Sequence, residues 1–484
     1  MKGGIVMVTE KSLSKKEKTP SAIMEFRLLE SKKDYKELLK LQDLGRILYN
    51  ACLGESLKRL NLVKNDALYK ETIAIPKDTK EGKEQRKENF KFLNEKYGFK
   101  NSSIQSFAVK CKNESKFIDK LGVHVIQKIA TTAFRTVQKV AFGKAKKVKF
   151  KRKGEFISLE GKNNSTFLRY SNAFALIGDM SIKCKMRKND PYFEHFLKHR
   201  IKYCRLVSRK FNNKYKFFLQ VVFEGKPYEK VKLGDSHTSL DIGPSTIAKV
   251  NDKNATLKRF CEDIVFNDKE IKKLQRKASR KLRLANPQNY TAGGAVKKGS
   301  KKWIRSNNYL KLQNKIADMK RRQAYHRKQL HGEEINLIIQ ESWKVSTEKL
   351  SYKAFQKLWG KSIASFAPSQ FVARLKDKIK LLGGEFVEIH TYTTKLSQTC
   401  ICGNVKKKSL KERFHHCEEC GLITQRDLLS AYLGLFVTKN GKTLKIKESY
   451  KNYKNYEPIL NNCIENLRKT KINNPSKVHS TFGI

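Results

Sequence analysis

The pattern of apolar and polar positions predicts strands, then helices, then strands again over residues 1–235. Near residue 24, apolar side chains alternate with charged ones, as in a strand with one buried face: Met24, Phe26 and Leu28. Apolar residues then recur every three or four positions, which predicts an amphipathic helix: Leu41, Leu44, Leu48 and Cys52. The helical pattern continues to about residue 142 and is broken at 77–100 by a charged loop or a solvated helix.

Residues 146–230 read as a small sheet or barrel. The runs 201–210 and 215–223 flank the pair Asn212-Asn213. Because Asn tolerates positive φ, this pair predicts a tight hairpin turn between two strands.

Residues 236–391 predict three consecutive strands, long basic helices, a strand, a helix and a final strand. The basic helices lie between Asp268 and Ser342, and the glycines at 383 and 384 end the later helix. This order is typical of an RNase H-like domain, although other α/β domains share it. The remaining residues, 441–484, are rich in Lys, Asn and Tyr and predict a disordered or RNA-binding tail.

The apolar runs are too short to cross a bilayer, which takes roughly 20 residues. The first residues also lack the apolar core of a secretory signal, so we expect a cytoplasmic protein.

The charge of the chain changes the picture most. Lys and Arg number 104 against 46 Asp and Glu, a formal net charge of +58. Such a surface favours a polyanionic partner, and nucleic acid is the obvious one. A hydrophobic content of 39% supports packed cores and argues against a wholly disordered basic protein. A basic ribosomal-type protein remains the alternative.

Three acids stand at the ends of predicted elements. Asp241 lies within an apolar strand, Glu348 closes the strand WKVSTEKL, and Asp427 opens the helix RDLLSAYLG. In an RNase H-like domain these element ends are neighbours. Converging carboxylates suit Mg²⁺, and two such ions about 3.5–4 Å apart support phosphodiester cleavage. The small residues Ala431 and Gly434 would let the helix lie close against the sheet.

Each acid also has an ordinary explanation. Asp241 can bond to the backbone of the following turn, Asp427 can complement its helix dipole, and Glu348 can be a surface acid beside Lys349. Only the three together, in this order, favour a catalytic site.

Four of the ten cysteines are clustered in two short motifs. Cys400-Ile-Cys402 and Cys417-Glu-Glu-Cys420 have the spacing of two knuckles that bind one tetrahedral, structural Zn²⁺. A disulfide or free thiols are the alternatives. Because the first knuckle is one residue tighter than usual, His415 or His416 could replace one thiol.

The segments SLDIGPSTIAKV, VSTEKLSY, LSQTCICG, CEECG and QRDLLSAYLG, in this order, resemble the RuvC-type nuclease of TnpB proteins, which transposons encode, and of compact type V CRISPR effectors. The resemblance covers about residues 236–440, and the N-terminal half agrees only in layout. It implies that Asp241, Glu348 and Asp427 are the nuclease triad, holding two Mg²⁺. It also implies that the zinc ribbon is inserted just before the third acid.

The resemblance implies an α+β multidomain protein with a barrel-like wedge domain at 1–32 and 146–235, interrupted by a helical recognition domain at 33–145. A RuvC nuclease domain (236–392, final helix 425–440) would carry a zinc ribbon at 393–424 and a basic tail at 441–484. The implied partners are a guide RNA and target double-stranded DNA, with one chain or a homodimer on one guide. The basic stretches 272–283 and 320–328 are candidates to contact the RNA–DNA heteroduplex.

The function that follows is RNA-guided DNA endonuclease. Two alternatives stay open: an RNA-guided DNA-binding protein that blocks a site without cleavage, and an RNase H-like recombinase that joins strands.

Overall fold

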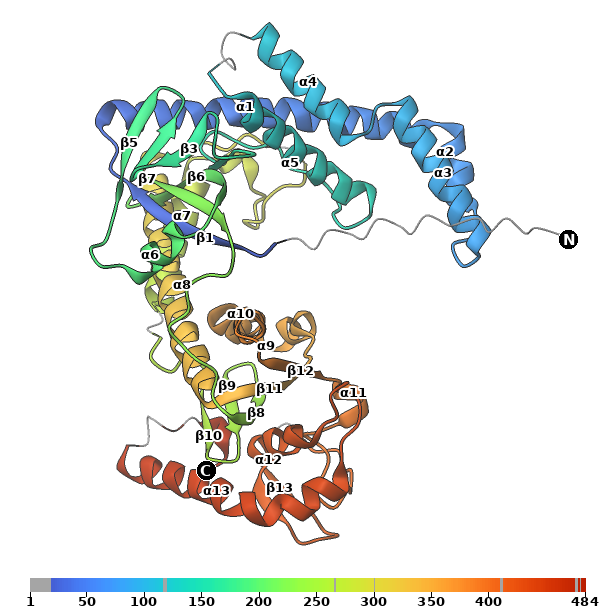
Figure 1. The fold of residues 1–484 in the computed structure, drawn as a ribbon, viewed down its shortest axis with the longest axis vertical. Helices are drawn as coiled ribbons and strands as arrows, with labels where there is room; N and C mark the ends of the chain where they lie inside the picture. The colour runs from blue at the N-terminus through green and yellow to red at the C-terminus, as the bar shows by residue number, and fades with distance from the viewer. Residues whose placement is uncertain are drawn as a thin grey trace, which may run out of the picture. The chain divides into compact units, whose positions relative to one another are not determined.

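The structure is a computed structural model that describes residues 19–115, 120–264, 267–299, 301–409, 412–474, 478 and 480–484. It is a mixed α/β multidomain fold with two compact units, Met1–Tyr228 and Glu229–Ile484 (Figure 1). Within the described residues, none of the helices is both long and apolar enough to span a membrane.

The first unit contains a seven-stranded antiparallel sheet of order β2-β6-β7-β1-β5-β4-β3. Its strands are β1 (Ser21–Leu28), β2 (Ser158–Glu160), β3 (Leu168–Ser171), β4 (Phe174–Ile177), β5 (Met180–Lys185), β6 (Ile201–Phe211) and β7 (Lys214–Glu224). β3, the last strand in this order, also contacts β6, the second strand, so the sheet curls toward a barrel. Asn212 and Asn213 adopt φ values of 44° and 67°, which confirms the predicted hairpin turn.

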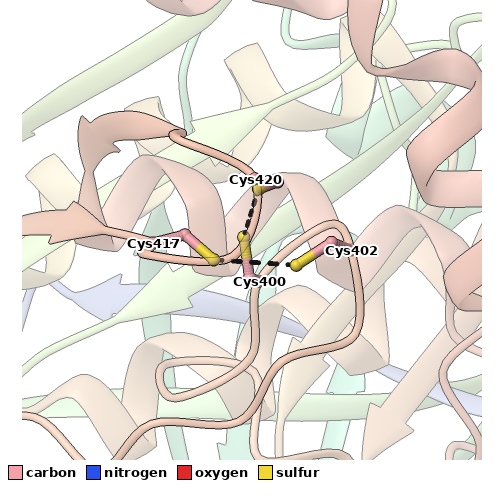
Figure 2. Close-up of side chains that lie close together, drawn as sticks. All are labelled: Cys400, Cys402, Cys417 and Cys420. Carbon is pink, nitrogen blue, oxygen red and sulfur yellow. Dashed lines mark hydrogen bonds between the residues drawn. The ribbon is translucent and has the colours of Figure 1, made fainter.

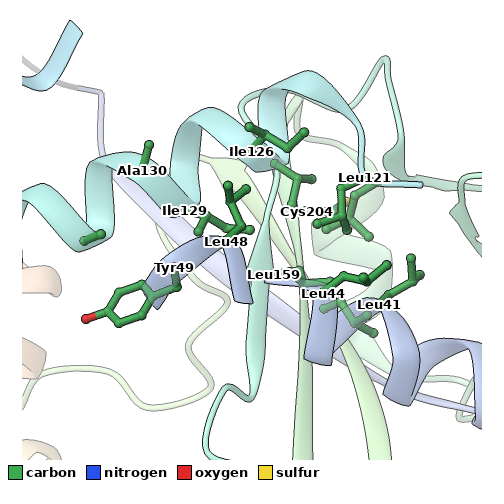
Figure 3. Close-up of a cluster of buried hydrophobic side chains, with 14 of the residues drawn as sticks. Leu41, Leu44, Leu48, Tyr49, Leu121, Ile126, Ile129, Ala130, Leu159 and Cys204 are labelled. Atoms are coloured by element: carbon green, nitrogen blue, oxygen red, sulfur yellow. The ribbon is translucent and has the colours of Figure 1, made fainter. Parts of the chain in front are cut away.

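Three helices pack on this sheet: α1 (Lys32–Asn65), α5 (Val123–Ala141) and α6 (Pro191–Leu197). The others pack on helices: α2 (Ala67–Ala74), α3 (Lys80–Lys96) and α4 (Asn101–Glu114). Ser31 begins α1 with a capping box to Asp34. The predicted apolar stripe of α1 is buried against α5 and the sheet, as Figure 3 shows for Leu44, Leu48 and Ile129. The charged stretch at 77–100 was predicted as a loop or a solvated helix. It contains a helix, α3.

The second unit contains a five-stranded sheet of order β10-β9-β8-β11-β12. Its strands are β8 (Ser236–Ile242), β9 (Thr246–Val250), β10 (Ala255–Arg259), β11 (Ser342–Glu348) and β12 (Glu385–Ile389). β8, β9 and β10 form an antiparallel meander, whereas β8, β11 and β12 run parallel. The predicted order of strands and helices in this region is confirmed, except that one further helix, at Tyr352–Phe366, lies between β11 and the predicted helix.

The helices of this unit are α7 (Asp268–Leu284), α8 (Asn307–Glu341), α9 (Tyr352–Phe366), α10 (Pro368–Leu381), α11 (Thr391–Thr394), α12 (Arg426–Leu433) and α13 (Ile446–Asn473). Short 3₁₀ turns lie at η1 (Pro287–Asn289), η2 (Gly434–Phe436) and η4 (Ser480–Phe482), and β13 (Phe414–His416) pairs with β14 (Ile423–Gln425).

Two apolar cores lie on opposite faces of the five-stranded sheet. One core joins Leu240 and Val345 to α8 and α10, and the other joins Val250 and Ile389 to α12 and α13. The sheet is therefore the middle layer of three.

Of the two alternatives predicted for 441–484, a disordered tail is wrong over α13, and an RNA-binding tail stays a prediction. This helix buries Tyr453, Leu460 and Cys463 in the second core. Apolar burial, which the Lys- and Asn-rich composition concealed, holds it in place. Helix α9 was not predicted either. The names wedge, recognition and nuclease domain, with their boundaries, stay predictions.

Candidate metal centres

The alternation of side chains along β8 determines where Asp241 points. Leu240 and Ile242 face the core made with α8 and α10. Because successive side chains of a strand point to opposite faces, Asp241 faces the α12 layer. Thr347 of β11 pairs in parallel with Leu240, so the next residue, Glu348, lies on the same face as Asp241.

Helix α12 lies close on this face and carries Asp427 in its first turn. The side chain of Gln425 begins the helix by accepting a hydrogen bond from the Leu428 amide at 2.8 Å. At the other end, a Cβ added to Gly434 would lie 2.2 Å from the Ser239 Oγ of β8. The predicted close packing of this small-residue face is therefore confirmed.

The three acids interact electrostatically. Burial raises the pKa of Asp241 well above its ordinary value, and the nearby charges of Asp427 and Glu348 raise it further. Burial also raises the pKa of Glu348 from 4.5 to about 7. The fold therefore gathers carboxylates that repel one another in a place poor in water, where a cation would be strongly favoured.

Asp427 has positive neighbours that the sequence analysis missed. The guanidinium of Arg426 lies 3.2 Å from Asp427 Oδ1, and that of Arg413 lies 4.0 Å from Oδ2. The Ser430 hydroxyl and the charge of Arg426 both act to lower the pKa of Asp241. Helical spacing could have indicated Ser430, which follows Asp427 by three positions on one face. Arg413 is remote in the sequence and gave no such signal.

The four cysteines come together as predicted. Figure 2 shows their thiols pointing toward one another, with Sγ–Sγ distances of 3.5 Å for Cys400–Cys420 and 3.6 Å for Cys402–Cys417. All four Sγ atoms lie within 4.8 Å of one another. Zn–S bonds of about 2.3 Å in a tetrahedron require sulfurs at about this separation. The cluster can thus hold a structural metal such as zinc.

Over the described part of the chain, these thiols are the only group of three or more Cys, His, Asp or Glu ligand atoms gathered so tightly. His415 and His416 are not part of it. The three carboxylates are spread more widely than the four thiols.

The comparisons with known proteins bear on this region of the chain. Residues 369–433 match a protein-family model described as "Cas12f1-like, TNB domain". The matched segment contains the four cysteines and Asp427. It confirms the predicted resemblance to compact type V CRISPR effectors, whereas no curated protein matches the chain.

Two solved structures are also similar to the chain. One, a Cas12f1–sgRNA–target DNA complex, has 12% identity and a TM-score of 0.45, covering 83% of this chain and 82% of that one. The other, a CRISPR–Cas12f ternary complex, has 14% identity and a TM-score of 0.27, covering 83% and 85%.

Proposed function

We propose that the chain is an RNA-guided DNA endonuclease whose five-stranded sheet forms an RNase H-like (RuvC) nuclease domain. One observation carries the proposal. Asp241, Glu348 and Asp427 come from three separate elements, yet the charges of the last two raise the pKa of the first. A fold has no structural reason to bring three carboxylates together, because their repulsion is destabilising unless a cation offsets it.

The donor set fits Mg²⁺. All three side chains offer hard oxygen ligands, which Mg²⁺ prefers. Their spread, wider than that of the thiols, is compatible with two ions about 3.5–4 Å apart rather than one ion bound by all three. When bound, such ions activate a water and stabilise the leaving oxygen of a phosphodiester.

The residues of the chain have separate tasks in this proposal. Asp241, in the buried position on β8, would anchor the ions, while Glu348 and Asp427 would hold them from the adjoining strand and helix. Arg426 and Arg413 stand beside Asp427 and would attract the scissile phosphate. The Cys400–Cys420 cluster offers four protein ligands and would leave no open position, so its role would be structural.

Guide RNA and target DNA are the proposed partners. A net charge of +58 suits a protein that holds many phosphates through their backbone, because each neutralised phosphate releases counterions. The match of 369–433 to a Cas12f1-like domain supports the same class.

The test compares two Asp→Asn variants of the full chain, purified with guide RNA and given target DNA and Mg²⁺. Asp241→Asn should bind the target like the wild type and cut it on the order of 10²–10³-fold more slowly. Asp252→Asn, an exposed acid in the turn before β10, is the matched control and should cut normally. Normal cutting by Asp241→Asn would defeat the assignment. Intact DNA in a stable wild-type complex would favour a non-cutting binder, and joined strands a recombinase.

A further inference from the structure

Helix α9 begins four residues after Glu348 and has two unlike halves. Its backbone is interrupted at Trp359, which has the non-helical values φ −125° and ψ 36°. We call residues 352–361 the aromatic half-helix. The remaining residues, to Phe366, form the anchored half.

The anchored half is fixed to the core. Phe366 is buried in the core formed with α8 and α10. Arg327 of α8 donates hydrogen bonds to the carbonyls of Ala364 and Ser365, at 3.0 and 2.9 Å, and the His331 ring bonds to the Phe366 carbonyl at 2.9 Å. These contacts hold the end of α9 against α8.

The aromatic half-helix lacks such contacts. Tyr352, Phe355 and Trp359 follow one another at helical spacing, with ring centroids 6.3 Å and 5.2 Å apart. All three rings are only partly buried, and none is part of the hydrophobic cores found among the described residues. Leu358 on the same half is 72% exposed. Phe355 and Trp359 are thus left half-exposed, outside these cores.

The charges on this half-helix indicate what covers the rings. Lys353, Lys357 and Lys361 recur at intervals of four and are exposed. Within the described part of the chain none of them pairs with an acid. The sequence from 349 to 376 contains no Asp or Glu at all. A protein partner would have to supply acidic groups for the lysines and, separately, apolar side chains for the rings.

Single-stranded nucleic acid matches both features. Its phosphates pair with lysines, and its unpaired bases stack on aromatic side chains at a gain that does not depend on sequence. A duplex hides its bases and offers only the phosphates.

We propose that the aromatic half-helix is a binding site for the single DNA strand that is led to Asp241, Glu348 and Asp427. The rings of Phe355 and Trp359 stack on successive bases, and the three lysines hold the phosphates. This inference rests on the proposed function, because the three acids are taken as the place where the strand is cut and α9 begins just after the strand that ends at Glu348.

Trp359 is itself the reporter for the test. The chain contains three tryptophans, so Trp303→Phe with Trp343→Phe leaves Trp359 as the sole emitter. This full-length variant is titrated with single-stranded oligothymidylate in buffer without Mg²⁺, while anisotropy of labelled DNA measures binding separately. We expect saturable quenching of Trp359 that follows the binding curve. An abasic strand of equal length should bind without quenching, because it has phosphates but no bases.

Two further variants separate stacking from charge. Phe355→Ala should weaken binding of oligothymidylate about tenfold and leave binding of the abasic strand unchanged. Leu358→Ala, which removes an exposed apolar side chain but no aromatic ring, is the matched control and should behave like the parent.

Unchanged Trp359 emission while oligothymidylate binds would overturn the inference. Equal quenching by the abasic strand or by a duplex would overturn stacking, and quenching that depends on protein concentration without DNA would assign the rings to a second copy of the chain. Asp241→Asn, made in the same Trp359-only variant, distinguishes the two proposals, because it should lose cutting and keep the quenching. If Trp359 is quenched but the wild type does not cut, the nuclease proposal fails and the strand site stands. If the wild type cuts but Trp359 is not quenched, only the strand site fails.

Discussion

The two candidate metal centres of this chain differ in how far apart their ligands lie in the sequence. Cys400, Cys402, Cys417 and Cys420 lie within one short segment, whereas the carboxylates of Asp241, Glu348 and Asp427 come from two strands and a helix spread over most of the second unit. The first centre is defined by spacing alone. The second exists only once the sheet has formed, so it reports on the fold as well as on chemistry.

The two centres also differ in how strongly their ligand side chains repel one another when no metal is bound. Burial raises the pKa of the Cys400 and Cys402 thiols, so these two stay uncharged at neutral pH without a metal, and only Cys417, whose pKa backbone hydrogen bonds lower to about 7 in spite of burial, is partly ionised. The thiols can therefore approach to 3.5 Å with little repulsion. The acids repel one another, as the raised pKa of Asp241 indicates. Losing the metal should therefore loosen a small segment in one case and leave a strained but folded core in the other.

The largest expected effect concerns the cysteines. Binding of structural Zn²⁺ contributes on the order of 10 kcal/mol to small zinc modules, so Cys417→Ser should lose the metal and unfold the segment around it. We expect one zinc per wild-type chain by elemental analysis, and fast hydrogen exchange near residues 400–420 in the variant, with the five-stranded sheet still protected.

Cys111→Ser is the matched control, because Cys111 is half-buried in α4 and far from the cluster in the sequence. It should keep its zinc. Full zinc content in Cys417→Ser would contradict the assignment of the four thiols.

The next effect is a pH dependence that only the acid centre should have. The pKa of Glu348 is raised from 4.5 in the unfolded chain to about 7 in the fold, so the folded state holds its proton more tightly. Glu348 by itself should therefore lower the stability of the metal-free wild type, relative to Glu348→Gln, by up to roughly 3 kcal/mol as the pH rises from about 4.5 to about 7. The comparison with the variant is needed because burial lowers the pKa of His237, His331 and His415 to about 4, which contributes with the opposite sign. Thermal melts across this range measure it, and Mg²⁺ should remove the loss because it binds the charged form.

Glu348→Gln should abolish this part of the pH dependence. Glu388→Gln should not, because the hydrogen bond from Lys376 lowers the pKa of Glu388 instead. Parallel melting curves for the wild type and Glu348→Gln across the range would contradict the burial of Glu348.

The smallest effect tests the packing that brings Asp427 to the sheet. Gly434→Ala places a Cβ 2.2 Å from Ser239 Oγ and should destabilise the fold by about 1–3 kcal/mol in denaturant titrations. Ser239→Ala removes that oxygen, which leaves the nearest Ser239 atom at 3.3 Å, and should restore part of the loss in the double variant.

Gly332→Ala in α8 is the control, because its nearest neighbour is the flexible end of Arg374 at 3.5 Å. It should be neutral or stabilising by up to about 1 kcal/mol, since Ala favours helices. A neutral Gly434→Ala would mean that α12 does not rest on β8 so closely.

Periodicity and turn chemistry were enough to predict the elements that carry both centres. The alternation around Asp241, the Asn212-Asn213 turn and the apolar stripe of α1 each reflect a local rule. The predicted cysteine cluster came from spacing in the same way. The roles of the three acids stay a prediction, because charge alone does not identify catalysis.

What the sequence did not reveal depends on contacts between distant residues or on irregular backbone. The many Lys and Asn residues argued against an ordered helix at α13, yet sparse apolar positions such as Tyr453 and Leu460 are sufficient once the sheet offers a surface. Helix α9 was missed because its period breaks at Trp359. Arg413 could not be linked to Asp427 without the fold.

The packing of α13 has a consequence for how the chain matures during translation. This helix closes one face of the five-stranded sheet, although the strands themselves are complete by Ile389. A nascent chain that has just released β12 from the ribosome exposes the apolar side chains of Val250 and Ile389 until the later helices emerge. During that interval the nascent protein is vulnerable to aggregation, and a stop codon placed before α13 would make that vulnerability permanent.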